Sequence, residues 1–95
     1  MTESEIQKEI MFELRLEGWY VLRLNSGRVH HNVRMCPPGT PDLLAVSADG
    51  RLIWIEVKTP IGELSEIQIE THEDLEMRNQ EVFVMTSAED IQTIG

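Results

Sequence analysis

The sequence is poor in cysteine, in basic residues and in long apolar runs. Its single cysteine, Cys36, excludes an internal disulfide and fits a reducing compartment. No apolar stretch approaches the ~18 residues of a membrane span. The acidic opening, Met1 to Glu5, lacks the apolar segment of a signal peptide. We therefore expect a cytoplasmic protein with no membrane partner.

Basic residues are outnumbered, with 8 Lys and Arg against 17 Asp and Glu, and the formal net charge is −9. This balance argues against nucleic acid as a partner, because Lys and Arg supply most non-specific affinity for phosphate. The charge is unevenly placed, however, because residues 19–41 contain no Asp or Glu. The basic and histidine side chains of this acid-free stretch are Arg23, Arg28, His30, His31 and Arg34. The stretch is a candidate track for phosphate, although three arginines in a loop are also ordinary for a solvated surface.

With 95 residues, the chain is long enough for one domain, residues 1–95, that buries roughly two-thirds of its unfolded surface. Hydrophobic periodicity predicts the order α-β-β-β-α-β-α. The helices are expected over residues 2–17, 65–78 and 88–94, and the strands over 19–24, 43–47, 52–57 and 81–85. Residues 28–38 have no clear period, and a loop this long in so small a domain is often functional.

Two helix starts carry the capping-box pattern, in which a Ser or Thr is followed three residues later by Glu or Gln. Thr2 with Glu5 fits it, as does Ser4 with Gln7, and the second helix offers Ser65 with Gln68. The residues expected to face the core are Ile6, Ile10, Phe12, Leu14 and Leu16 in the first helix, and Ile67, Thr71, Leu75 and Met77 in the second.

Charged residues lie at the ends of the two central strands, next to apolar residues. Asp42 begins the first strand, and Glu56 and Lys58 share one face near the end of the second. If the strands pair as a hairpin, one register places Asp42 across from Glu56 and Lys58. An exposed ion pair would contribute only about 0–1 kcal/mol. Their apolar flanks instead predict burial, which is costly for charges unless they are paired or hold a metal.

The residue types in this cluster suit hydrolysis of a phosphodiester. Two carboxylates, helped by a backbone carbonyl between them, are ligands that Mg²⁺ prefers. The ion activates water and offsets charge on a phosphoryl oxygen. Lys58 can orient or deprotonate that water, or stabilise the charge that develops on phosphate. The order of a helix, then Asp on one strand, then Glu-x-Lys on the next, is more specific than either motif alone.

These motifs resemble the PD-(D/E)xK nuclease superfamily, and more narrowly its VRR-NUC family. The matching segments are Gly39-x-Pro41-Asp42-Leu43, Glu56-Val57-Lys58, Pro60, Leu64-Ser65, Gln68, Ser4-Glu5-Ile6-Gln7 and Arg23-x-Asn25-Ser26-Gly27. The resemblance covers nearly the whole chain. It implies a restriction-endonuclease-like α/β fold with an α-β-β-β-α-β core, in which helices flank a mixed four-stranded sheet.

The resemblance also implies a site. Asp42, Glu56 and the Val57 carbonyl would bind Mg²⁺, with Mn²⁺ able to substitute, and no organic cofactor is expected. Lys58 would be the catalytic lysine, and Gln68 would support it or the water. A glutamate of the first helix would complete the site: Glu5 fits best, with Glu9 one turn later as the reserve. DNA contacts are expected from Arg23, Asn25, Ser26, Arg28, His30, His31 and Arg34.

Stand-alone members of this kind would act as homodimers on branched DNA such as Holliday junctions, in a bacterial or phage-infected cell. Two alternatives remain open: a catalytically silent DNA-binding module, and an acidic protein-interaction domain that mimics DNA. A zinc site from His30, His31 and Cys36 is disfavoured because no second ligand pair has zinc spacing. Trp19 and Trp54 are expected in the core.

Overall fold

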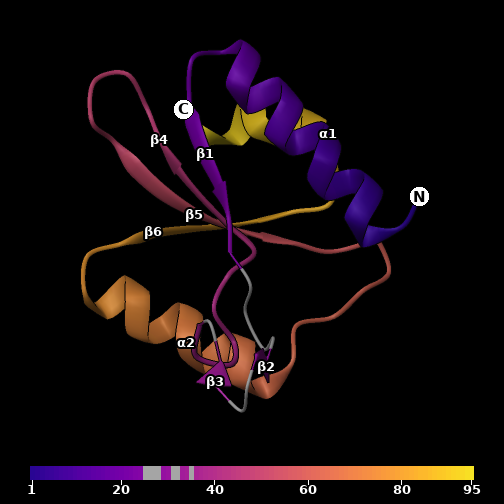
Figure 1. Cartoon of the computed structure of the whole chain (residues 1–95), viewed down its shortest axis with the longest axis vertical. Coiled ribbons are helices and arrows are strands. Elements are labelled where there is room, and N and C mark those ends of the chain that lie inside the picture. The colour runs from indigo at the N-terminus through magenta and orange to yellow at the C-terminus, as the bar shows by residue number, and fades with distance from the viewer. Residues whose placement is uncertain (25–28, 31–32, 35) are drawn as a thin grey trace.

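A mixed four-stranded sheet lies at the centre of the computed structural model, which describes residues 1–24, 29–30, 33–34 and 36–95 (Figure 1). Its strand order is β1-β4-β5-β6. The strands are β1 (Tyr20–Arg23), β4 (Leu43–Val46), β5 (Leu52–Val57) and β6 (Glu81–Met85). The first three are antiparallel neighbours, and β6 is parallel to β5. The mixed sheet flanked by helices confirms the expected fold class.

Helices cover both faces of this sheet (Figure 1). On one face lie α1 (Glu3–Leu16) and η1 (Ala88–Ile94), which is a 3₁₀-helix, and on the other lies α2 (Glu66–Met77). An antiparallel pair, β2 (Val29–His30) and β3 (Val33–Arg34), forms a separate two-stranded sheet. Among the described helices, none combines the length and apolar character needed to cross a bilayer.

The core lies between the sheet and the pair formed by α1 and η1. Alternate strand residues point to this side, which is why every second side chain of β4 and β5 is buried up to Ile55. The core side chains are Ile6, Ile10, Leu14, Val21, Leu43, Ala45, Ile53, Ile55, Val57, Met85, Ile91 and Ile94. The intervening residues of β4 and β5 therefore face α2, and Glu56 is among them.

Two expectations about α1 are wrong. Phe12 and Leu16 are 61% and 67% exposed rather than part of the apolar stripe. Each helical residue turns the chain by about 100°, so a residue two positions beyond Ile10 or Leu14 lies on the opposite side of the helix. The apolar stripe that meets the sheet is built on the residues spaced by four, Ile6, Ile10 and Leu14, with Gln7 buried and Met11 packed beside them.

The inward face of α2 also differs from the expected one. Ile67 and Met77 are 45% and 84% exposed, so their predicted burial is wrong, whereas Thr71 and Leu75 are half-buried. The buried residue of this helix is His72. The helix is rotated toward a polar partner on the sheet, because the side chain of Glu56 lies beneath it and contacts His72.

Candidate active site

The pairing of β4 with β5 brings the two predicted acids together. Leu43 lies opposite Ile55, so Asp42 and Glu56 follow at the point where this ladder ends. The Asp42 Oδ2 atom accepts a hydrogen bond of 2.7 Å from the Val57 backbone N–H. The Asp42 side chain thus takes the place of a backbone carbonyl at the end of the ladder, which fixes one carboxylate oxygen. The predicted register is confirmed.

Gly39 brings the segment before Asp42 close to α2. Its φ of +86° lies in the left-handed region that favours glycine. A Cβ atom at this position would lie 2.6 Å from the Ile67 carbonyl oxygen, in the first turns of α2. Any side chain here would push the loop away from the helix. The glycine therefore keeps Asp42 and the start of α2 in one compact site.

Glu56 is the buried centre of the site, with 1% of its surface exposed. Its Oε1 atom lies 3.1 Å from His72 Nε2, and its Oε2 atom lies 3.5 Å from the Gln68 amide nitrogen. Gln68 and His72 are four residues apart and therefore share one face of α2. Throughout the described part of the chain, every fully buried side-chain nitrogen or oxygen has a hydrogen-bond partner.

Burial and a second carboxylate shift the titration of Glu56. Burial is the main cause that raises its pKa to about 9, followed by a hydrogen bond with Asp42 and the charge of Asp42. The charge of Lys58 opposes this rise in pKa, and that of Glu3 adds to it. At neutral pH Glu56 therefore keeps its proton in the metal-free protein. Burial also lowers the pKa of His72, which favours the neutral imidazole.

Lys58 and the Val57 carbonyl complete the end of β5. The Lys58 side chain is half-buried, and its backbone N–H donates to the Met85 carbonyl at 3.0 Å. The N–H and C=O groups of one strand residue point to the same edge. Because the Val57 N–H points to Asp42, the Val57 carbonyl opens toward Asp42 as well. The structure thus brings Asp42, Glu56, Val57, Lys58 and Gln68 together.

The predicted glutamate of α1 is engaged elsewhere. The Glu5 carboxylate accepts a hydrogen bond of 2.9 Å from the Thr2 backbone N–H, and this bond is the main reason its pKa is lowered. The reserve candidate, Glu9, lines a surface hollow beside Ala88 of η1. The α1 acid whose charge raises the pKa of Glu56 is instead Glu3. A catalytic role for Glu5 stays a prediction.

The sequence interpretation did not single out three polar residues of the two helices as candidates for the site. They are Glu3 and Gln7 of α1, and His72 of α2. Gln7 and His72 are 8% and 6% exposed, although both are polar. The signal for both was a spacing of four residues on one helix face. Gln7 follows Glu3 by four, just as His72 follows Gln68 by four.

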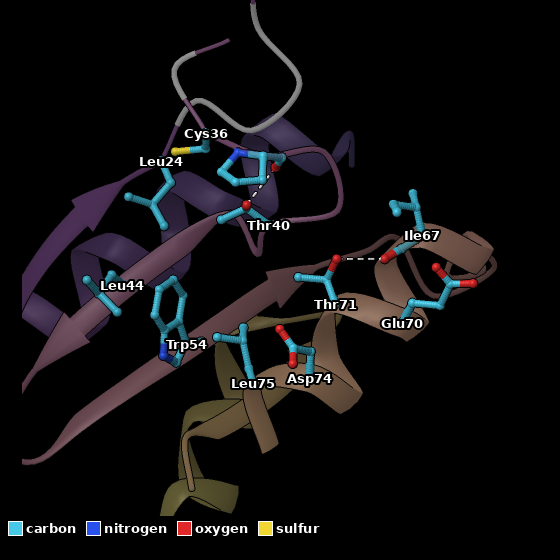
Figure 2. A pocket seen from close by; sticks show the side chains of 11 residues that line it. Leu24, Cys36, Thr40, Leu44, Trp54, Ile67, Glu70, Thr71, Asp74 and Leu75 are labelled. Atoms are coloured by element: carbon cyan, nitrogen blue, oxygen red, sulfur yellow. Dashed lines mark hydrogen bonds between the residues drawn. The ribbon is translucent and has the colours of Figure 1, made fainter. Parts of the chain in front are cut away.

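A cavity of about 520 Å³ adjoins the site between α2 and the sheet. Figure 2 shows Leu44 and Trp54 on one wall, with Glu70 and Asp74 projecting from α2 on the other. Trp54, expected in the core, is half-buried here, and its indole N–H donates to Gln80 at 3.0 Å. The largely apolar lining does not suit a hard cation, so the metal chemistry belongs to Asp42 and Glu56.

The predicted DNA contacts fall mainly on a part of the chain that is not described. Arg23 is exposed at the end of β1. His30 and Arg34 belong to β2 and β3, but their side chains lie outside the described residues. Asn25, Ser26, Arg28 and His31 lie wholly outside them. The DNA-binding role of all seven residues stays a prediction.

The donor set at the end of the sheet fits a hard divalent cation. Outside residues 25–35, no three His, Cys, Asp or Glu side chains gather around a common point. The protein ligands would therefore be two carboxylates and a backbone carbonyl, with water filling the other positions, as Mg²⁺ tolerates. A cation would also replace the proton that Glu56 retains. The residues present fit the expected metal.

The fold and its paired acids define the restriction-endonuclease-like class of α/β domain. Within that class, the sequence matches the VRR-NUC domain family over residues 4–89, and the chain belongs to this family. A solved structure described as a VRR_NUC domain is similar with a TM-score of 0.77 and 24% identity, covering 99% of this chain and 95% of that chain. No curated protein matches the sequence. Family membership implies a nuclease-type function that acts on DNA.

Proposed function

We propose that this protein is a divalent-cation-dependent endodeoxyribonuclease that hydrolyses phosphodiester bonds. The observation that carries the proposal is the buried Glu56 facing Asp42, with a pKa raised to about 9. Two acids placed this close are costly unless a proton or a cation lies between them. Lys58 follows two residues later, and its charge lowers the pKa of Glu56. This combination suits phosphodiester hydrolysis better than structural stabilisation.

Each residue has a separate role in the proposed reaction. Asp42, Glu56 and the Val57 carbonyl would hold Mg²⁺, for which Mn²⁺ can substitute. When bound, the ion supplies charge stabilisation at a phosphoryl oxygen and lowers the pKa of water. Lys58 donates hydrogen bonds to the attacking water or to the oxygen on which charge develops. Gln68, in the first turn of α2, places its amide nitrogen 3.5 Å from Oε2 of Glu56 and supports Lys58 or the attacking water.

Branched DNA, a homodimer and a cytoplasmic setting belong to the same proposal. They are supported by the family resemblance and by the acid-free basic stretch on an otherwise acidic chain. One small domain meets only part of a four-way junction, whereas two copies related by a two-fold axis match its symmetry. Sedimentation velocity of the full chain, with and without junction DNA, tests the dimer; a monomer under both conditions would refute it.

The activity is tested with labelled four-way junctions, flaps, forks and linear duplexes, in Mg²⁺, Mn²⁺ or EDTA. We expect cleavage of branched DNA that EDTA abolishes. Asp42→Asn should lower the rate by at least about 10²–10³-fold, the loss typical of one electrostatic group. Asp49→Asn is the matched control, because Asp49 lies in the exposed turn between β4 and β5. Cleavage of no substrate, or equal rates for Asp42→Asn and wild type, would reject the proposal.

A further inference from the structure

The buried histidine of α2 has no place in the roles assigned so far. His72 lies beside Glu56, and their side chains are 8% and 2% exposed. Packing alone does not require a polar ring here, because an aliphatic side chain would bury more apolar surface at lower cost. Two aliphatic residues of α2, Ile67 and Ile69, are exposed instead. The contact with Glu56 is therefore the feature of His72 that needs an explanation.

The geometry divides the two carboxylate oxygens of Glu56 between two partners. His72 Nε2 lies 3.1 Å from Oε1, whereas the amide nitrogen of Gln68 lies 3.5 Å from Oε2. The first distance is that of an ordinary hydrogen bond, and the second is at the limit of a weak one. Oε1 is thus firmly occupied, and Oε2 remains the oxygen that a cation can take.

We propose that His72 is a positioning residue that holds Oε1 of Glu56 through its Nε2–H, so that Oε2 is presented to the metal beside Asp42. This inference rests on the proposed metal-dependent function. An ionised carboxylate only accepts hydrogen bonds, so His72 must donate from Nε2 when the site is loaded. A carboxylate whose Oε1 is already held loses less rotational freedom when its Oε2 binds the ion than a freely rotating carboxylate would. Outer-shell partners of this kind typically contribute 10–100-fold to metal affinity.

The test is calorimetric titration of Mn²⁺ into the full chain, comparing wild type with His72→Leu and His72→Gln. His72→Leu should weaken Mn²⁺ binding by about 10–100-fold. His72→Gln places an amide N–H near the position of Nε2, and should restore affinity to within about threefold of wild type, given the reach of that donor. Thr71→Val, one residue away and half-buried, should bind Mn²⁺ as the wild type does. Rescue by Gln but not by Leu separates hydrogen bonding from packing.

A second measurement covers the case in which His72→Leu does not fold. In wild-type protein saturated with Mg²⁺, ¹⁵N NMR of the imidazole should show a proton on Nε2. An unprotonated Nε2 in that state would overturn the inference, as would wild-type Mn²⁺ affinity in a folded His72→Leu variant. If wild-type protein binds no Mn²⁺ at all, the proposed function fails and the inference fails with it. Normal wild-type binding combined with an unaffected Leu variant removes the role of His72 alone.

Discussion

The two long helices, α1 and α2, begin with the same capping motif, but the capping residue has a different role in each. In α1 the Thr2 backbone N–H donates to Glu5 at 2.9 Å, and in α2 the Ser65 backbone N–H donates to Gln68 at the same distance. Both are complete capping boxes. The carboxylate of Glu5 has only acceptors, so the cap uses it locally. The amide of Gln68 also has a donor, and that donor reaches Glu56.

This difference shows how one local motif can be either structural or connected to a site. Gln68 satisfies the helix start with its oxygen and approaches the buried acid with its nitrogen. Glu5 is exposed and remains with its cap. The two helices also affect acids in opposite directions, because the α1 cap lowers the pKa of Glu5, whereas burial beneath α2 raises that of Glu56.

The largest expected effect is on the free energy of unfolding, which should depend on pH because of Glu56, the acid buried beneath α2. Glu5 in the α1 cap should not contribute to this dependence. The pKa of Glu56 is about 9 in the folded protein against 4.5 for the free group. Between these values the folded state keeps a proton that the unfolded state has lost, so raising the pH destabilises the metal-free protein. The expected slope is about 1.4 kcal/mol per pH unit. Urea denaturation in EDTA at several pH values measures it.

Two variants test the source of this slope. Glu56→Gln cannot titrate, so its free energy of unfolding should lack this fall between about pH 5 and 8.5, a window set by the two pKa values. Glu5→Gln should keep the fall, because the lowered pKa of Glu5 affects stability only at acidic pH, where its contribution is lost as the pH drops. Identical pH profiles for wild type and Glu56→Gln would contradict the prediction. Added Mg²⁺ should flatten the wild-type profile, because the ion replaces the proton.

The next largest effect is expected on the rate of DNA cleavage, when the capping residue of α2, Gln68, is replaced by the type of residue that caps α1. Gln68→Glu keeps the oxygen that the Ser65 cap needs but removes the N–H that faces Glu56. It also adds a third carboxylate, so cleavage should fall by about 10–100-fold, the loss typical of a group that supports a ligand. The rate of branched-DNA cleavage in Mg²⁺ is the measurement.

The reciprocal change, Glu5→Gln, is the control. It leaves an oxygen for the Thr2 N–H, and Glu5 has no contact with Glu56 among its hydrogen bonds. A role for Glu5 in the cap alone predicts a cleavage rate within about twofold of wild type, whereas the catalytic role predicted from the sequence gives a much larger loss. A loss equal to that of Gln68→Glu would place Glu5 in the site after all and remove the contrast between the helices.

Much of this arrangement could be predicted from the sequence, because it depends on local rules. Alternation of apolar residues predicts β4 and β5, and their register follows once the turn between them is tight. The pairing of Asp42 with Glu56 is a direct consequence of that register. The two caps, Thr2 with Glu5 and Ser65 with Gln68, fit the capping-box spacing, although spacing left Ser4 with Gln7 as an alternative for the first helix.

The parts that could not be predicted depend on tertiary contacts. The apolar pattern of α2 favoured Ile67 as an inward residue, but a buried acid on the sheet selects His72. The sequence likewise offered Glu5 as the acid of α1. The electrostatic reach of Glu3 to Glu56 becomes apparent only when the helix is docked on the sheet. Periodicity identifies a helix better than it identifies which polar residue the helix buries.

The smallest expected effect concerns the caps themselves. Thr2→Ala and Ser65→Ala each remove the hydroxyl that accepts from the third residue of its helix, at 3.2 Å and 3.3 Å. Each should lower the free energy of unfolding by about 1 kcal/mol. Urea denaturation at neutral pH measures both losses. Ser4→Ala, which changes a residue of α1 outside the capping box, should cost less than about 0.5 kcal/mol.

The same variants should differ in their Mn²⁺ affinity, which links the caps to the site. Ser65→Ala loosens the turn that carries Gln68, so Mn²⁺ should bind a few-fold more weakly, less than the 10–100-fold expected when an outer-shell group is removed. Thr2→Ala should leave binding unchanged, because the Glu5 cap does not reach the acid pair. Equal Mn²⁺ affinities in the two variants, despite equal losses of stability, would mean that the Ser65 cap is as purely structural as the Thr2 cap.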